Sequence, residues 1–109
     1  MMRTGVRYRI VLVTCASISE ARKIGRNVVE KRLAACANIL SSIESIYRWK
    51  GKVEQSREVL MLIKTTASRL PALESRVKRM HSYDLPEFIA LPLAAGSQSY
   101  LEWIRKSTK

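Results

Sequence analysis

The stretch that decides the fold is CANILSSIESIYRWKGKVEQSREVLMLIKT, residues 36–65. It holds two runs rich in β-forming residues, 36–48 and 53–65, on either side of a short polar segment. A two-residue turn at Lys50 and Gly51 would close these runs into a β-hairpin, because glycine readily adopts the positive φ that such a turn needs. The stretch therefore predicts two neighbouring antiparallel strands.

This turn also predicts the register of the hairpin. It sets Glu44 opposite Arg57, which is a favourable cross-strand charge pair, and Trp49 opposite Lys52. Each arm would have about twelve residues, or roughly 40 Å at ~3.3 Å per residue, against a usual strand length of ~17–20 Å. The tip must then overhang the domain, and an overhanging tip with Tyr47 and Trp49 suits contact with another subunit.

Upstream of the hairpin, the sequence predicts a strand and then a helix. Residues 6–14, VRYRIVLVT, are rich in β-branched and apolar residues. Ser17 and Glu20 have the spacing of a capping box, in which a serine begins the helix and a glutamate three residues later reaches back. We expect the helix to continue to about Ala35.

Downstream, the pattern predicts a second helix, a fourth strand and a short last helix. The second helix would cover residues 69–81, with Ser68 as its N-cap, and the strand residues 88–93. Ser99 and Glu102 form another capping box that would open the last helix. The order β-α-β-β-α-β is that of an α+β, ferredoxin-like sandwich with two helices on one face of an antiparallel sheet.

The strands of this sheet are apolar on both faces, which two helices on one side do not explain. RIVLVT, EVLMLIK and FIALPLA all lack the alternation of a half-exposed strand. The terminal helix could cover only part of the second face. We expect a second copy of the same chain to cover the rest.

With 109 residues the chain fits a single domain, 1–109, in which we expect residues 1–6 and 106–109 to be flexible. The apolar run from Ile10 to Val13 is shorter than the ~7–15 residues of a secretion signal. No run approaches the ~20 residues of a membrane span. We therefore expect a cytoplasmic protein that has no membrane contact and whose Cys15 and Cys36 are reduced.

Twenty Lys and Arg against nine Asp and Glu give a net charge of +11. Such a charge permits binding of nucleic acid or of anionic ligands. The basic residues are scattered over the polar sides of the predicted helices, however, and the central strands offer aliphatic side chains in place of base-stacking aromatics. We therefore expect solvated helix faces and no nucleic-acid partner.

The segment MHSYDLPEF, residues 80–88, holds the only histidine of the chain, with Asp84 and Glu87 close behind it. One imidazole and two carboxylates can bind a divalent cation, and the soft sulfur of Cys15 would suit copper. A histidine at a helix C-terminus can equally stabilise the helix end. These residues alone do not decide whether His81 binds a metal ion or stabilises the helix end.

Several stretches in fixed order resemble the CutA1 family of divalent-cation-tolerance proteins. They are VVEKRLAACANIL, SIESIYRWKGKVEQSREVLMLIKTTAS, MHSYDLPEFIALPL and YLEWI, and the match runs from about Ile10 to Ile104. The resemblance implies a homotrimer of ferredoxin-like subunits, similar to the PII signalling proteins, with hairpin arms that reach neighbouring subunits. It also implies a role in tolerance of copper and other divalent metals.

In copper-binding members a cysteine of the first strand acts with histidines at the end of the second helix, which here points to Cys15 and His81. Family members often have proline at the positions of Ala16 and Ser82. Met80 stands where a second histidine would strengthen a site. We expect copper or another divalent cation to bind weakly at His81, Cys15, Asp84 and Glu87, with no obligatory cofactor.

Some of these residues also suit two other functions. Cys15 and His81 could form a nucleophile and base, but no third orienting residue or oxyanion-hole pattern accompanies them, so we expect no enzyme. The alternative to metal response is a PII-like sensor of a small anionic ligand, bound in clefts between subunits. Its candidate ligand-binding residues are Lys64, Tyr47, Trp49 and Tyr83.

Overall fold

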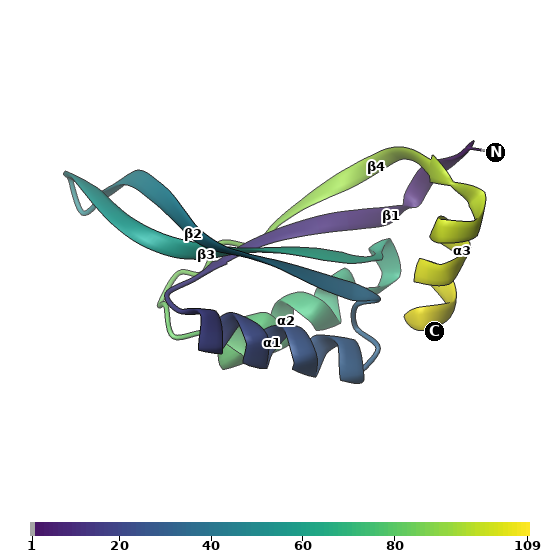
Figure 1. The fold of residues 1–109 in the computed structure, drawn as a ribbon, viewed down its shortest axis with the longest axis horizontal. Helices are drawn as coiled ribbons and strands as arrows, with labels where there is room; N and C mark the ends of the chain where they lie inside the picture. Colours follow the sequence, from purple (N-terminus) through teal and green to yellow (C-terminus); the bar gives the residue numbers. More distant parts are fainter. Residues whose placement is uncertain (1) are drawn as a thin grey trace.

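The computed structural model describes residues 2–109, and of Thr4 the backbone alone. Four strands form one sheet in the order β2-β3-β1-β4, with every neighbouring pair antiparallel (Figure 1). The predicted α+β, ferredoxin-like order with a terminal helix is therefore confirmed. The elements are β1 (Met2–Cys15), α1 (Ile18–Glu30), β2 (Cys36–Trp49), β3 (Lys52–Thr66), a 3₁₀ turn (Ala67–Arg69), α2 (Leu70–Met80), β4 (Ile89–Ser97) and α3 (Gln98–Ser107).

The turn between β2 and β3 is the predicted one. Lys50 has φ 50° and Gly51 φ 81°, and positive φ at both central residues is the geometry of a type I′ hairpin turn. The two predicted residue pairs are present in the register, Glu44 opposite Arg57 and Trp49 opposite Lys52. The identity of the two turn residues thus predicts the strand pairing in the outer half of the hairpin.

Nearer the domain, a β-bulge changes this register. Leu40 pairs with Leu60, whereas Ile43 pairs with Glu58, so β2 has one residue more than β3 between the two pairs. Ser42 lies at the bulge with φ 64°, a conformation that serine seldom adopts. Because a bulge increases the local twist, the arm turns as it leaves the sheet. The Cα trace measures 46 × 25 × 23 Å, and the hairpin lies at one end of its long axis (Figure 1).

The first helix ends at Glu30, five residues before the predicted end. Arg32 has φ 60°, its N–H donates to Val29 O at 3.0 Å, and the Leu33 N–H donates to Val28 O at 2.9 Å. These two bonds form a Schellman motif, which closes a helix with one left-handed residue. That residue is usually glycine. Because it is an arginine here, the sequence does not indicate that the helix ends at this point.

The starts of two helices also differ from the prediction. The Ser68 side chain does not cap α2; instead a 3₁₀ turn leads into the helix, with Pro71 in its first turn. Ser97 rather than Ser99 caps α3, since its hydroxyl accepts from the Tyr100 N–H at 3.3 Å. For α1 the capping box is confirmed, because Ser17 Oγ accepts from the Glu20 N–H at 3.2 Å.

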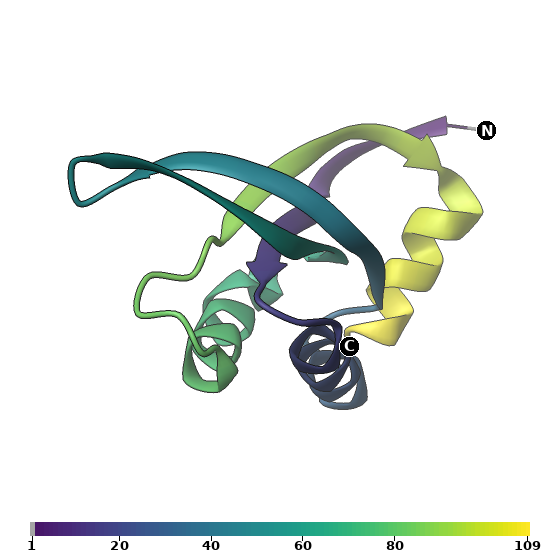
Figure 2. The same cartoon turned by 60° about the vertical axis from the view of Figure 1, so that its left-hand side comes forward.

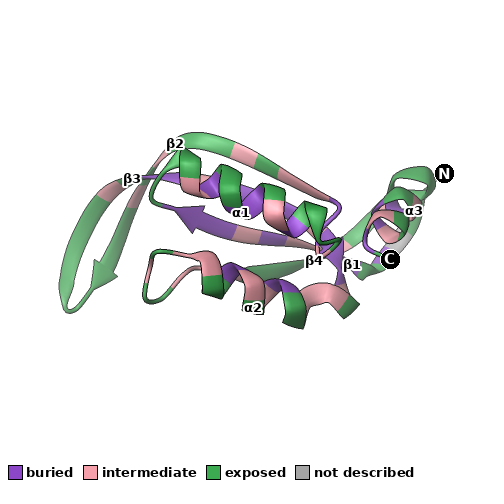
Figure 3. Cartoon of the chain, turned by 90° about the horizontal axis from the view of Figure 1, so that it is seen from below, coloured by how far each residue is buried: buried purple, intermediate pink, exposed green. Residues whose placement is uncertain are grey.

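Helices α1 and α2 lie side by side on one face of the sheet (Figures 2 and 3). Between them and the sheet lies the core, in which alternate residues of β1 and β3 meet the apolar sides of the two helices. Its fully buried members include Val11, Val13, Met61, Ile63, Ile24, Val28, Leu73 and Val77.

Helix α3 packs only over the end of the sheet, where Tyr8 meets Leu101 and Ile104. Much of the face opposite α1 and α2 stays open, as the apolar strands led us to expect. Ile89 and Leu91 of β4 pair with Leu12 and Ile10, which alternate along β1 with the core residues Val11 and Val13. The exposed fractions of Leu40, Ile89 and Leu91 are 43%, 49% and 45%.

Within residues 2–109, most of both terminal segments lies in β1 and α3. Met2 pairs with Ser97 in the sheet, and Thr108, only 4% exposed, donates its hydroxyl to Ile104 O at 2.9 Å. Of the segments expected to be flexible, residues 2–6 thus lie in β1 and 106–107 in α3, while residue 1 lies outside the described range. Within residues 2–109, none of the helices has the length and apolar character needed to cross a membrane.

Candidate metal site at the end of β1

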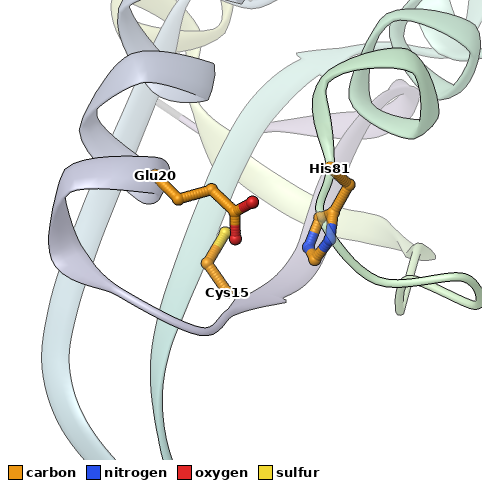
Figure 4. A group of neighbouring side chains, drawn as sticks. All are labelled: Cys15, Glu20 and His81. Atoms are coloured by element: carbon orange, nitrogen blue, oxygen red, sulfur yellow. The ribbon is translucent and has the colours of Figure 1, made fainter.

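Three segments of the chain meet at the carboxyl end of β1, and each supplies one potential metal ligand (Figure 4). Cys15 is the last residue of β1, Glu20 lies in the first turn of α1, and His81 directly follows α2. Their sulfur, carboxylate oxygen and ring nitrogen all lie within 4.8 Å of one another. The fold brings them together because the start of α1 packs beside the end of α2.

Both ring nitrogens of His81 are hydrogen-bonded. Nε2 lies 2.7 Å from the carbonyl oxygen of Thr14, and Nδ1 accepts from the Tyr83 N–H at 3.1 Å. A carbonyl can only accept and an amide N–H can only donate, so this pattern assigns the proton to Nε2 of a neutral ring. The backbone N–H of His81 also bonds Val77 O at 3.0 Å, so His81 is the residue at which α2 ends.

Glu20 is the member of this group that the sequence did not reveal as a ligand. One carboxylate oxygen accepts from the Ser82 N–H at 2.9 Å, and the other from the Ala16 N–H at 3.4 Å. Its capping-box role was predicted, and that role directs the side chain back toward the residues just before the helix. Since Cys15 is one of those residues, the capping box was the available signal.

Cys15 is fully buried, with an exposed fraction of 0%. Burial, and after it the negative charges of Glu20 and Glu58, raises the pKa of the thiol to about 12. The side chain is therefore a neutral thiol at physiological pH. A metal ion that binds its sulfur must displace the proton, since the thiolate is the ligand.

The two carboxylates predicted as ligands lie outside this three-residue group. Asp84 is exposed in the loop after α2. Glu87 is half-buried, and burial followed by the charge of Glu58 raises the pKa of its carboxyl group. Glu58 is 9% exposed and lies in β3. The sequence did not predict a role for it near this site, because it begins the apolar run EVLMLIK of that strand.

The residues predicted to bind an anionic ligand are spread over the chain. Tyr83 donates its hydroxyl to Glu58 Oε2 at 2.8 Å, and burial raises the pKa of that phenol. Lys64 donates to the Tyr100 hydroxyl on α3 at 3.2 Å. Tyr47 and Trp49 lie on the hairpin arm, each 42% exposed. One chain by itself thus does not gather Lys64 with the two aromatic residues of the arm.

Comparison with known proteins identifies relatives over nearly the whole chain. The family model described as "CutA1 divalent ion tolerance protein" matches residues 9–107. The divalent-cation tolerance protein CutA of Thermus thermophilus is 48% identical and is matched over 91% of this chain and 96% of its own length. The human Protein CutA is 52% identical over 89% of this chain, which spans only 54% of the human protein.

Solved structures agree with these matches. The structure of CutA from Synechococcus elongatus superposes with a TM-score of 0.95 at 35% identity, covering 100% of this chain and 96% of that one. The fold, the order of its elements and the sequence motifs therefore all lead to the same family.

Proposed function

The chain belongs to the CutA1 divalent ion tolerance family, and from this premise we propose that it acts by binding a metal ion at Cys15, Glu20 and His81. The observation that carries the proposal is the convergence of a thiol, a carboxylate and an imidazole within 4.8 Å at the junction of three elements. The Thermus relative is named a divalent-cation tolerance protein, and metal binding at this site would serve that role.

The donor set favours ions of intermediate to soft character. Thiolate and imidazole together suit copper and zinc, whereas magnesium and calcium prefer sites made of oxygen ligands. In a tetrahedral zinc site with bonds of about 2.3 Å to sulfur and 2.0–2.1 Å to nitrogen, neighbouring ligand atoms lie about 3.6 Å apart. The present atoms, at up to 4.8 Å, must move closer by roughly 1 Å. We therefore propose a weak site for copper or another divalent ion rather than an obligatory cofactor.

Titration calorimetry with Zn²⁺ and Cu²⁺ tests this site. Replacing a ligand in His81→Ala or Glu20→Gln should weaken Zn²⁺ binding at least about tenfold, because even outer-shell partners of metal ligands contribute 10–100-fold. The matched control is Asp84→Asn, which removes an exposed carboxylate three residues from His81 and should bind like the wild type. Zn²⁺ heats that are the same in His81→Ala and in the wild type would exclude the proposed site.

We further propose that the functional unit is a homotrimer whose subunits cover one another's open sheet faces. Two features support this assembly: the apolar residues left exposed on β4 and β2, and the long arm with its exposed Tyr47 and Trp49. Light scattering decides between a trimer and a single chain of 12.4 kDa.

Binding without turnover is the activity that the site geometry favours. The neutral thiol of Cys15 is a poor nucleophile, and Nε2 of His81 is engaged by the Thr14 carbonyl rather than by a hydroxyl or thiol to be activated. A PII-like response to a small anionic ligand is the second outcome of the same calorimetry. Saturable heat with ATP in the absence of metal, lost in Lys64→Ala, would favour that function.

We propose the cytoplasm as the site of action. The support is chemical: Cys15 and Cys36 are both free thiols, which persist in a reducing compartment. Fractionation of cells that produce the full-length protein tests this proposal, and recovery outside the cytoplasm would refute it.

A further inference from the structure

Two backbone N–H groups of the loop after α2 bond directly to two of the candidate metal ligands. The Ser82 N–H donates to Glu20 Oε2 at 2.9 Å, and the Tyr83 N–H donates to His81 Nδ1 at 3.1 Å. We call this pair of hydrogen bonds the latch. It attaches the loop to the start of α1 and to the histidine ring seen in Figure 4.

A metal ion and the Tyr83 N–H compete for His81 whichever ring nitrogen the metal takes. A metal on Nδ1 occupies the lone pair that now accepts from Tyr83. A metal on Nε2 displaces the proton that Nε2 now shares with Thr14 O, and a neutral imidazole then carries its proton on Nδ1. An Nδ1–H group faces the Tyr83 N–H as one donor toward another, so this hydrogen bond is lost in both cases.

A metal ion and the Ser82 N–H compete less directly for Glu20, because a carboxylate has about four sites for accepting hydrogen bonds. A metal on Glu20 still draws electron density from the oxygen that holds Ser82 and weakens the second bond of the latch. Both bonds of the latch therefore depend on whether the site is empty.

The loop has little regular structure to hold it once the latch opens. Residues 81–88 lie outside the helices and strands, and such segments open at low free-energy cost. A remaining contact is the Tyr83 hydroxyl, which donates to Glu58 Oε2 at 2.8 Å. Glu58 pairs with Ile43 directly beside the bulge of β2, at the base of the hairpin arm.

We propose that metal capture opens the latch and loosens the loop of residues 82–87, so that occupancy of the site is transmitted through Tyr83 and Glu58 to the base of the arm. This inference rests on the proposed metal site. It gives that site a regulatory output, because the arm is the part of the chain that we expect to reach a neighbouring subunit.

Amide hydrogen exchange, followed by NMR on the whole protein with and without saturating Zn²⁺, tests the latch. Loss of one hydrogen bond should make the Tyr83 amide exchange about five- to tenfold faster when Zn²⁺ is bound. The Thr108 amide, which bonds to Ile104 O at the far end of the domain, is the internal control and should not change. Without metal, His81→Ala should accelerate the Tyr83 amide in the same way.

The outcomes separate this inference from the metal site itself. Zn²⁺ heat together with an unchanged or slower Tyr83 amide overturns the latch and leaves the metal site standing. Absence of Zn²⁺ heat overturns both. Should Tyr83 exchange be unaltered in metal-free His81→Ala, the hydrogen bond to the ring does not hold the loop, and the inference fails whatever the metal does.

A second variant tests the transmission step. Tyr83→Phe keeps the ring and the backbone N–H but removes the hydroxyl that bonds Glu58. Zn²⁺ should shift the amide resonances of Glu58 and Ile43 in the wild type and not in this variant, while Zn²⁺ affinity stays within about twofold. Equal shifts in both proteins would show that the signal does not pass through this contact.

Discussion

Leu91→Lys is the sharpest test of the idea that the open sheet face is buried by other subunits. Leu91 lies on β4, pairs with Ile10 of β1, and is 45% exposed in the single chain. Because nearly half of the side chain already meets solvent, a lysine there can direct its charge into water. The substitution should thus change the stability of an isolated chain little and act mainly on assembly.

The expected size of the effect follows from burial. Burying a leucine completely contributes about 1.5–3 kcal/mol, so the part of Leu91 left for an interface contributes about 1 kcal/mol per chain. Partial desolvation of a lysine adds roughly 2 kcal/mol, for a total of about 3 kcal/mol per chain. At about 1.4 kcal/mol per tenfold, three chains lose about six decades of association constant. The dissociation constant of a trimer contains the square of concentration, so the half-dissociation concentration rises about a thousandfold.

Light scattering over a range of protein concentrations measures this shift. The matched control is Val29→Lys on α1, which places the same charge at a residue of similar exposure, 38%, on the helical side of the domain. The control should assemble like the wild type. If Leu91→Lys keeps the wild-type mass and midpoint, the open face is not the interface, and the account of its apolar strands is wrong.

Three further predictions concern the turn of the arm, the N-cap of α1 and the half-buried carboxyl group of Glu87. Gly51→Ala, at φ 81°, should destabilise the protein by about 1 kcal/mol in urea unfolding, whereas Lys52→Ala in the adjacent strand should have less effect. Ser17→Ala removes the N-cap of α1, should cost about 1 kcal/mol, and should also weaken Zn²⁺ binding, because the capping box orients Glu20. Glu87→Gln should raise the melting temperature at pH 7 but not near pH 4. The pKa of Glu87 is raised in the folded state, so ionisation of its carboxyl group opposes folding only when the pH rises above the pKa of an ordinary glutamate. If Glu87→Gln changed the melting temperature equally at both pH values, this reasoning would be wrong.

The parts of the fold that the sequence predicts are those governed by local chemistry. Lys50 and Gly51 specify a two-residue turn, and the turn alone sets the pairing of the outer arm. The bulge at Ser42 and the helix end at Arg32 were missed for one shared reason. Both residues adopt positive φ without being glycine, so tertiary packing holds a conformation that local preference does not announce.

The candidate site was predicted only in part because it is made by tertiary contact. Cys15 and His81 were identified, whereas Asp84 and Glu87 were chosen for their closeness to His81 along the chain. The third member of the group is Glu20, sixty-one positions before His81 in the sequence, and its distance in space depends on how α1 packs beside α2. Position in the chain is a poor guide to a site built from the ends of three elements.

The distribution of charge explains why a cation would come to this place in a strongly basic chain. A net charge of +11 repels metal ions from the molecule as a whole. Glu20, Glu58 and Glu87, three of only nine acidic residues, nevertheless lie near the end of β1. Burial, and after it the charges of Glu20 and Glu58, raises the pKa of Cys15, and burial followed by the charge of Glu58 raises the pKa of Glu87. These raised pKa values mean that each added negative charge there is unfavourable in the metal-free protein. A cation bound at the proposed site would reduce that penalty, because it would stabilise the thiolate and the carboxylates together.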